Sequence, residues 1–66
     1  MITWDLKTND FSEIPQKQID FLNDIKIICE KHNLSISHED VHGGFIIEEF
    51  NQGNIDWLFD ASINWL

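Results

Sequence analysis

The only cysteine and all three histidines of this 66-residue chain lie within fourteen residues, from Cys29 to His42. A chain with one cysteine cannot form an internal disulfide, and a domain of this size buries only about 60% of the surface that its unfolded form exposes. Such small scaffolds are usually stabilised by a metal ion, by self-association or by an unusually well packed core. The cluster of one cysteine and three histidines is therefore a candidate for stabilising the fold through a metal ion.

The four potential metal ligands in this stretch are spaced as two pairs. Cys29 and His32 lie three residues apart, and His38 and His42 lie four apart. One thiolate and three imidazoles in a two-plus-two arrangement are typical of a closed structural zinc site. We therefore predict a structural zinc ion bound by Cys29, His32, His38 and His42. The alternative is that Cys29 is a buried apolar side chain and the histidines are ordinary surface residues.

Residues 38–42 also match the H-E-x-x-H signature of zinc proteases, since they read His-Glu-Asp-Val-His. That mechanism needs both histidines on one face of a helix, beside an open metal position. The segment follows a strand-like Leu-Ser-Ile-Ser and runs into Gly43-Gly44, which disfavours a helix. We therefore expect no metalloprotease, and because the other hydroxyls and carboxylates form no catalytic constellation, we expect no enzyme.

Hydrophobic periodicity predicts a strand, a helix, a hairpin and a second helix, in that order. They are a strand over residues 2–7, a helix that starts around Ser12 and ends at His32, a hairpin of strands 34–38 and 45–50, and a helix from residue 55 to residue 66. Ser12 is a good helix cap, and Pro15 suits a first helical turn. This order predicts one α+β domain over residues 1–66, with two helices packed on a small, mainly antiparallel sheet.

The predicted first helix carries an apolar stripe that ends in the metal-ligand cluster. Its members are Ile14, Phe21, Leu22, Ile25, Ile28, Cys29 and His32. Side chains three or four residues apart share a helix face, so Cys29 and His32 are expected together on the core face. Alternation in the next strand places His38 on the face of Leu34 and Ile36. The helix and the hairpin would then bring the two ligand pairs together.

The charge is acidic and unevenly distributed. Twelve Asp and Glu residues face four Lys and no Arg, which gives a net charge of −8, and no basic residue follows Lys31. Such a surface repels nucleic acid and membranes and favours a basic protein partner, although it is equally typical of a small protein that is simply soluble. No apolar stretch approaches the about twenty residues of a membrane span, so we expect a cytoplasmic protein.

Trp57, Ala61 and Trp65 are spaced four apart in the predicted last helix and form a second apolar stripe. Large aromatic side chains dominate interface energetics, so this stripe predicts contact with a second copy or with a partner. The alternative is that the tryptophans cover an edge of the sheet. A homodimeric structural module is therefore a second functional hypothesis.

Two stretches, HEDVHGGFIIEEF (residues 38–50) and NIDWL (residues 54–58), resemble small acidic proteins of phages and prophages of low-GC Gram-positive bacteria. These include type II anti-CRISPR proteins of similar size and acidity, at least one of them associated with zinc. The resemblance implies an inhibitor that occupies an RNA-guided nuclease of the host and blocks its DNA binding or loading. Such nucleases hold nucleic acid in a positively charged channel. The side chains expected to make this contact are Glu39, Asp40, Glu48, Glu49, Asp56 and Asp60, with Trp57 or Trp65 as apolar anchors.

Overall fold

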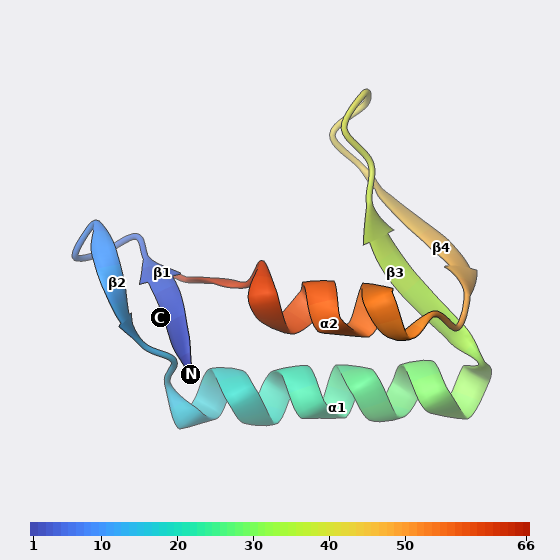
Figure 1. Cartoon of the computed structure of the whole chain (residues 1–66), viewed down its shortest axis with the longest axis horizontal. Helices are drawn as coiled ribbons and strands as arrows, with labels where there is room; N and C mark the ends of the chain where they lie inside the picture. The colour runs from blue at the N-terminus through green and yellow to red at the C-terminus, as the bar shows by residue number, and fades with distance from the viewer.

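Two helices lie side by side and separate two small sheets in the computed structural model, which describes residues 1–66 (Figure 1). The elements in chain order are β1 (Ile2–Asp5), β2 (Asp10–Glu13), α1 (Gln16–His32), β3 (Leu34–His38), β4 (Phe45–Glu49), α2 (Gln52–Asp60) and β5 (Ile63–Asn64). One sheet has the order β2-β1-β5, and the other is the β3-β4 hairpin. The predicted α+β class with two helices and mostly antiparallel strands is confirmed, but the strands form two sheets and not one.

The first sheet contains a strand, β2, where the sequence predicted the start of a helix. Ser12 pairs with Thr3 of β1 and caps no helix, and α1 begins only after Pro15, which occupies the cap position with no side-chain hydrogen bond. Trp4 and Phe11 face each other across the two strands, with their rings 5.0 Å apart and edge to face. Cross-strand aromatic pairs of this kind stabilise antiparallel ladders. The local preference of Ser12 for a cap is overridden by this pairing.

The hairpin follows α1 directly, as predicted. Asn33 ends the helix in the left-handed conformation (φ 55°), and its N–H donates to the carbonyls of Cys29 and Glu30. Asparagine tolerates this conformation better than most residues, so it is a common helix-ending residue. The Asn33 carbonyl in turn accepts the N–H of Phe50 at 3.0 Å, which joins the start of β3 to the end of β4. A single residue thus turns the chain from helix into strand.

The second helix is shorter than predicted, because the chain leaves it at Asp60 to form β5. Asn51 caps the start of α2, and its side chain accepts the N–H of Gly53 at 2.8 Å. Beyond Ala61 the chain is extended, and Ile63 and Asn64 of β5 pair in parallel with β1. Asn64 is buried and donates to the Asp5 carboxylate at 3.3 Å. Pairing with the far end of the chain thus replaces the predicted last turns of helix.

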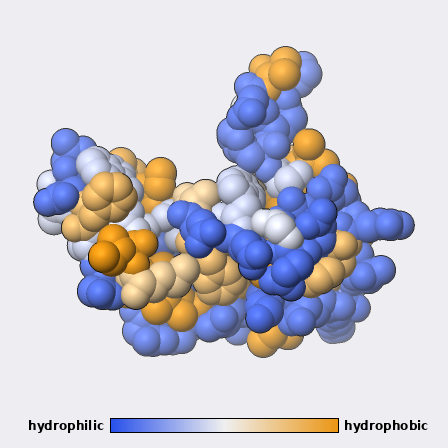
Figure 2. All heavy atoms as spheres, in the orientation of Figure 1, coloured by the Kyte–Doolittle hydropathy of each residue, from blue (hydrophilic) through white to orange (hydrophobic).

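The core is small, and the surface is correspondingly rich in apolar side chains. Only Ile14, Leu22, Cys29 and Ile55 are buried apolar residues. The accessible surface is 4956 Å², against about 4,400 Å² for a typical folded chain of this mass. The radius of gyration is 12.7 Å, against about 11 Å. Figure 2 shows apolar side chains at the surface near β1 and β2 and at the hairpin tip, so the fold leaves apolar area open to contact.

Candidate functional site

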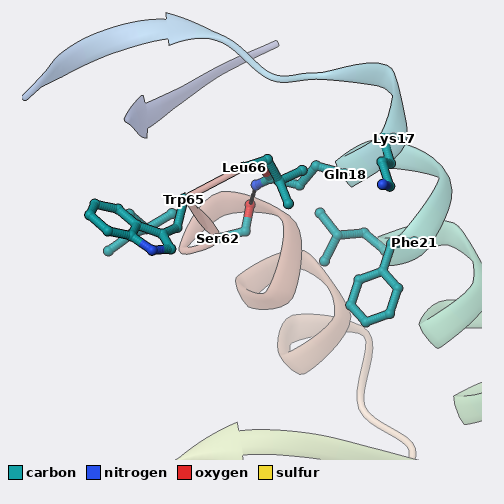
Figure 3. A pocket seen from close by; sticks show the side chains of 8 residues that line it. Lys17, Gln18, Phe21, Ser62, Trp65 and Leu66 are labelled. Atoms are coloured by element: carbon teal, nitrogen blue, oxygen red, sulfur yellow. Dashed lines mark hydrogen bonds between the residues drawn. The ribbon is translucent and has the colours of Figure 1, made fainter. Parts of the chain in front are cut away.

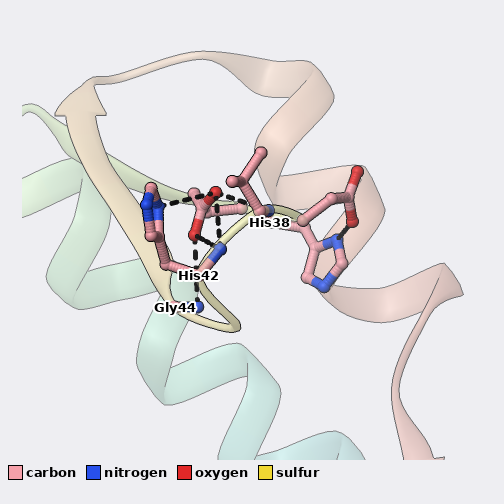
Figure 4. Close-up of polar contacts among 6 residues, drawn as sticks. His38, His42 and Gly44 are labelled. Carbon is pink, nitrogen blue, oxygen red and sulfur yellow. Dashed lines mark hydrogen bonds and ion pairs between the residues drawn. The ribbon is translucent and has the colours of Figure 1, made fainter.

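The loop between β3 and β4 is organised by one carboxylate. Glu39 accepts the N–H groups of Val41 at 2.6 Å, His42 at 2.8 Å and Gly44 at 3.4 Å (Figure 4). Gly43 adopts a positive φ of 70°, which suits glycine. These amide donors, that of His42 foremost, hold the pKa of Glu39 below its ordinary value. Glu39, which the sequence assigned to partner contact, therefore has a structural role within its own loop.

His38 at the end of β3 and His42 in the loop each lie beside an acidic neighbour. His38 Nδ1 is 2.6 Å from Asp40 Oδ1, and His42 Nδ1 is 3.5 Å from Glu39 Oε1. The imidazole of His38 also lies 6.0 Å from the ring of Trp57 on α2, with an interplanar angle of 33°. Residues 38–42 are the end of a strand and a loop, so the expectation that this H-E-x-x-H segment is not helical is confirmed.

The four predicted zinc ligands do not come together. Cys29 is buried within α1, His32 is exposed at its last turn, and no group of three or more His, Cys, Asp or Glu side chains is placed to hold a metal ion. β3 carries His38 roughly 13 Å away from the end of the helix, at about 3.3 Å per residue. The predicted convergence of the two ligand pairs is therefore wrong for this arrangement, and the residues present do not fit a zinc ion.

His38 shares the strand face of Leu34 and Ile36, as the alternation predicts, but the most deeply buried residue of β3 lies on the other face. Leu34 is 42% exposed, whereas Ser35 is only 1% exposed. The Ser35 hydroxyl donates to the Glu49 carbonyl at 2.8 Å and accepts from the Asn54 side chain of α2 at 2.9 Å. A short polar side chain lies under the helix because it joins β3, β4 and α2 through hydrogen bonds.

Four exposed carboxylates lie on β4 and α2, and we call them the acidic set. They are Glu48, Glu49, Asp56 and Asp60. Glu48 accepts from Asn54 at 2.6 Å and Asp56 from Gln52 at 3.0 Å, but no member is within 4.0 Å of a basic group. The three ion pairs of the structure are those of Met1 with Glu13 and of His38 and His42 with their acidic neighbours. The acidic set is thus uncompensated within the chain.

The predicted tryptophan stripe does not form, because Trp57 lies in α2 and Trp65 follows β5. Trp57 is half-buried, whereas Trp65 is 66% exposed. Trp65 lines a hollow of about 430 Å³ between α1 and the C-terminal segment (Figure 3). The lining residues are Lys17, Gln18, Phe21, Leu22, Ser62, Ile63, Trp65 and Leu66.

This apolar hollow was missed because residues 61–66 were assigned to a helix. Phe21 was expected on the core face, but it is 65% exposed at the rim of the hollow. Gln18 is buried there and donates to the Ser62 hydroxyl at 2.9 Å. The alternation of Ser62, Ile63, Asn64 and Trp65 is a period-two signal that could have indicated the strand.

Neither helix is long and apolar enough to cross a membrane. Comparison with protein-family models, with curated protein sequences and with solved structures finds no match to this chain.

Proposed function

We propose that this protein is a non-enzymatic binding module that occupies a basic surface of a partner protein in the cytoplasm. The observation that carries the proposal is the acidic set, whose carboxylates have no basic neighbour in a half of the chain without Lys or Arg. Unpaired carboxylates of one sign steer a protein toward an oppositely charged partner and raise its association rate. The open, apolar surface of the fold adds area that a partner can bury.

The partner class that we favour is an RNA-guided nuclease of the type II CRISPR systems. The support for this choice is the resemblance of residues 38–50 and 54–58 to small acidic phage proteins. A nuclease of this kind holds nucleic acid in a positively charged channel, which an acidic protein can occupy in place of DNA. Asp40 projects from the loop as a further exposed carboxylate, and Trp57 and Trp65 remain the proposed apolar contacts.

The test measures binding of the purified protein to a panel of type II nucleases, together with their DNA cleavage. We expect tight binding at low salt and loss of cleavage. Replacing Glu49 and Asp60 by Gln and Asn removes two charges that make no hydrogen bond within the chain, and we expect about tenfold weaker binding.

The matched control carries Asp24→Asn and Glu30→Gln on α1, which remove the same charge from exposed side chains elsewhere. We expect this control to bind nearly as tightly as the unmodified chain. Failure to bind any nuclease of the panel would refute this partner class. Equal weakening by both double variants would show that only net charge matters.

A homodimeric module is the second candidate function. Two copies would associate through the apolar hollow and not through a helical stripe. Large apolar side chains line the hollow and are open to solvent, since Phe21, Trp65 and Leu66 are 65%, 66% and 58% exposed. Sedimentation equilibrium at increasing concentration tests this candidate, and Trp65→Ser should shift the mass toward the monomer. A monomeric mass at high concentration would refute it.

A further inference from the structure

The hairpin has a free edge along β4. β4 pairs with β3 on one side only, and all five of its residues are exposed. Figure 1 shows the loop end of the hairpin projecting beyond the two helices, with β3 beside α2 and β4 on the side remote from α2. An unpaired strand edge presents main-chain donors and acceptors to any extended segment of suitable sequence.

The ladder identifies the main-chain groups that point outward. Glu39 donates to Gly44 and Phe50 donates to Asn33, at the two ends of the hairpin. Hydrogen-bonded and non-hydrogen-bonded pairs alternate along an antiparallel ladder, so Phe45 and Ile47 fall at the non-hydrogen-bonded positions. Their N–H and C=O groups are therefore directed away from β3. The edge ends at Glu49, whose carbonyl accepts from the Ser35 hydroxyl.

The only protective charges on the β4 edge are negative, at Glu48 and Glu49, so they oppose like-charged strands but not a basic one. β4 contains no Pro and no Lys, and its pairing with β3 is continuous, without a bulge. Phe45 and Ile47 are 65% and 63% exposed, and Glu49 follows them on the same face. The edge thus offers two apolar positions and then one negative charge, each two residues from the next.

We infer that the free edge of β4 binds an extended segment of the partner as an added antiparallel strand. From its N-terminus, this segment has a basic residue opposite Glu49. An apolar residue then lies opposite Ile47, and an apolar or aromatic residue lies opposite Phe45. Main-chain hydrogen bonds supply affinity in this mode, and the alternate side chains supply specificity. The inference rests on the proposed function, because it names how the basic partner is held.

Charge favours such a partner over a second copy of the chain. Each copy carries a net charge of −8. A symmetric pairing of two β4 strands about Ile47 would place the two Glu48 residues on diagonal neighbouring positions, where like charges oppose association. A basic segment is instead attracted electrostatically to this edge.

The test uses a short synthetic peptide with the pattern basic-polar-apolar-polar-aromatic and extra lysines before it. Its affinity is measured by fluorescence anisotropy, and hydrogen exchange is followed at single amides. We expect the peptide to slow amide exchange at Phe45 and Ile47 at least tenfold. The exchange rate of the Ile46 amide, which already points toward β3, should change little. A peptide of the same composition in scrambled order should bind much more weakly.

Two matched pairs of variants report on the edge. Ile47→Lys places a like charge on the edge and should reduce peptide affinity more than tenfold, whereas Ile27→Lys, at a similarly exposed site on α1, should change it less than twofold. Glu49→Gln should weaken binding about threefold to fivefold, and Glu30→Gln should not.

The outcomes separate this inference from the proposed function. A nuclease or peptide that binds without slowing exchange at Phe45 and Ile47 would overturn the edge inference alone. Protection of these amides that rises with protein concentration, without peptide, would assign the edge to a second copy and overturn it as well. Absence of nuclease binding, with the peptide still protecting Phe45 and Ile47, would refute the partner class but support the edge.

Discussion

The carboxylate of Glu39 accepts the amide N–H of His42 at 2.8 Å and so closes the loop at the tip of the hairpin. The same carboxylate accepts the N–H groups of Val41 and Gly44. One side chain therefore holds the conformation of the loop from which Asp40 projects.

We expect Glu39 to make the stability of the fold depend on pH. Its pKa is lower in the folded chain than its ordinary value of 4.5, because the ionised form accepts the loop amides. The stabilisation is therefore fully present above pH 4.5 and is lost as the pH falls through the lower folded pKa. Urea unfolding from pH 7 to pH 2 should show this loss in the unmodified chain and its absence in Glu39→Gln. Parallel curves of unfolding free energy against pH for the unmodified chain and Glu39→Gln would contradict the role of Glu39. The control is Glu30→Gln, at an exposed site on α1.

Metal addition and removal distinguish the sequence-based zinc site from the structural arrangement. Because Cys29 is buried in α1 and His38 lies at the far end of β3, we expect neither zinc nor a chelator to change the melting temperature. Metal analysis of the purified protein accompanies the melts. Stoichiometric zinc, with a melting temperature that falls in chelator and in His38→Ala, would show instead that the four ligands converge and would contradict this arrangement.

Ile55 should be the most sensitive position of the small core. It is 2% exposed, so Ile55→Ala removes buried methyl groups and leaves a cavity that costs about 2–5 kcal/mol. For a domain of this size that is a large part of the free energy of unfolding. Thermal melts followed by circular dichroism should show a strongly lowered or absent transition. Ile27→Ala, at a 59% exposed site, should cost less than about 0.5 kcal/mol, and similar losses for both would contradict the position of the core.

Asn64 should hold β5 in place through its side chain. It donates to Asp5 at 3.3 Å and accepts the N–H of Leu66 at 2.8 Å, and it is 4% exposed. Asn64→Ala leaves these partners unsatisfied and should cost about 1–3 kcal/mol in urea unfolding. Asn23→Ala, at an exposed site on α1, serves as the control. An unchanged unfolding midpoint in Asn64→Ala would show that the C-terminal segment does not depend on this contact.

The hairpin was predictable because its signals are local. Alternation over residues 34–38 and the Gly43-Gly44 pair each act within a few residues, and the structure has the strand and the loop where these signals place them. The end of the helix at His32 and the strand that follows it were therefore located correctly. The two ligand pairs do not meet, because His38 is the last residue of the extended strand β3 and lies far from the end of α1.

The amino-acid sequence by itself determined the α+β class, the helix that ends at His32, the hairpin and the one-sided distribution of charge. Tertiary structure decided that Asp10–Glu13 and Ile63–Asn64 are strands, that Glu39 binds its own loop and that Cys29 lies apart from His38. The physical reason is the distance along the chain over which each kind of signal acts. Periodicity and turn residues act between near neighbours, whereas β5 and β1 pair residues that lie 59 positions apart in the chain, and the Asn64 side chain finds its partner Asp5 only once the two strands have met.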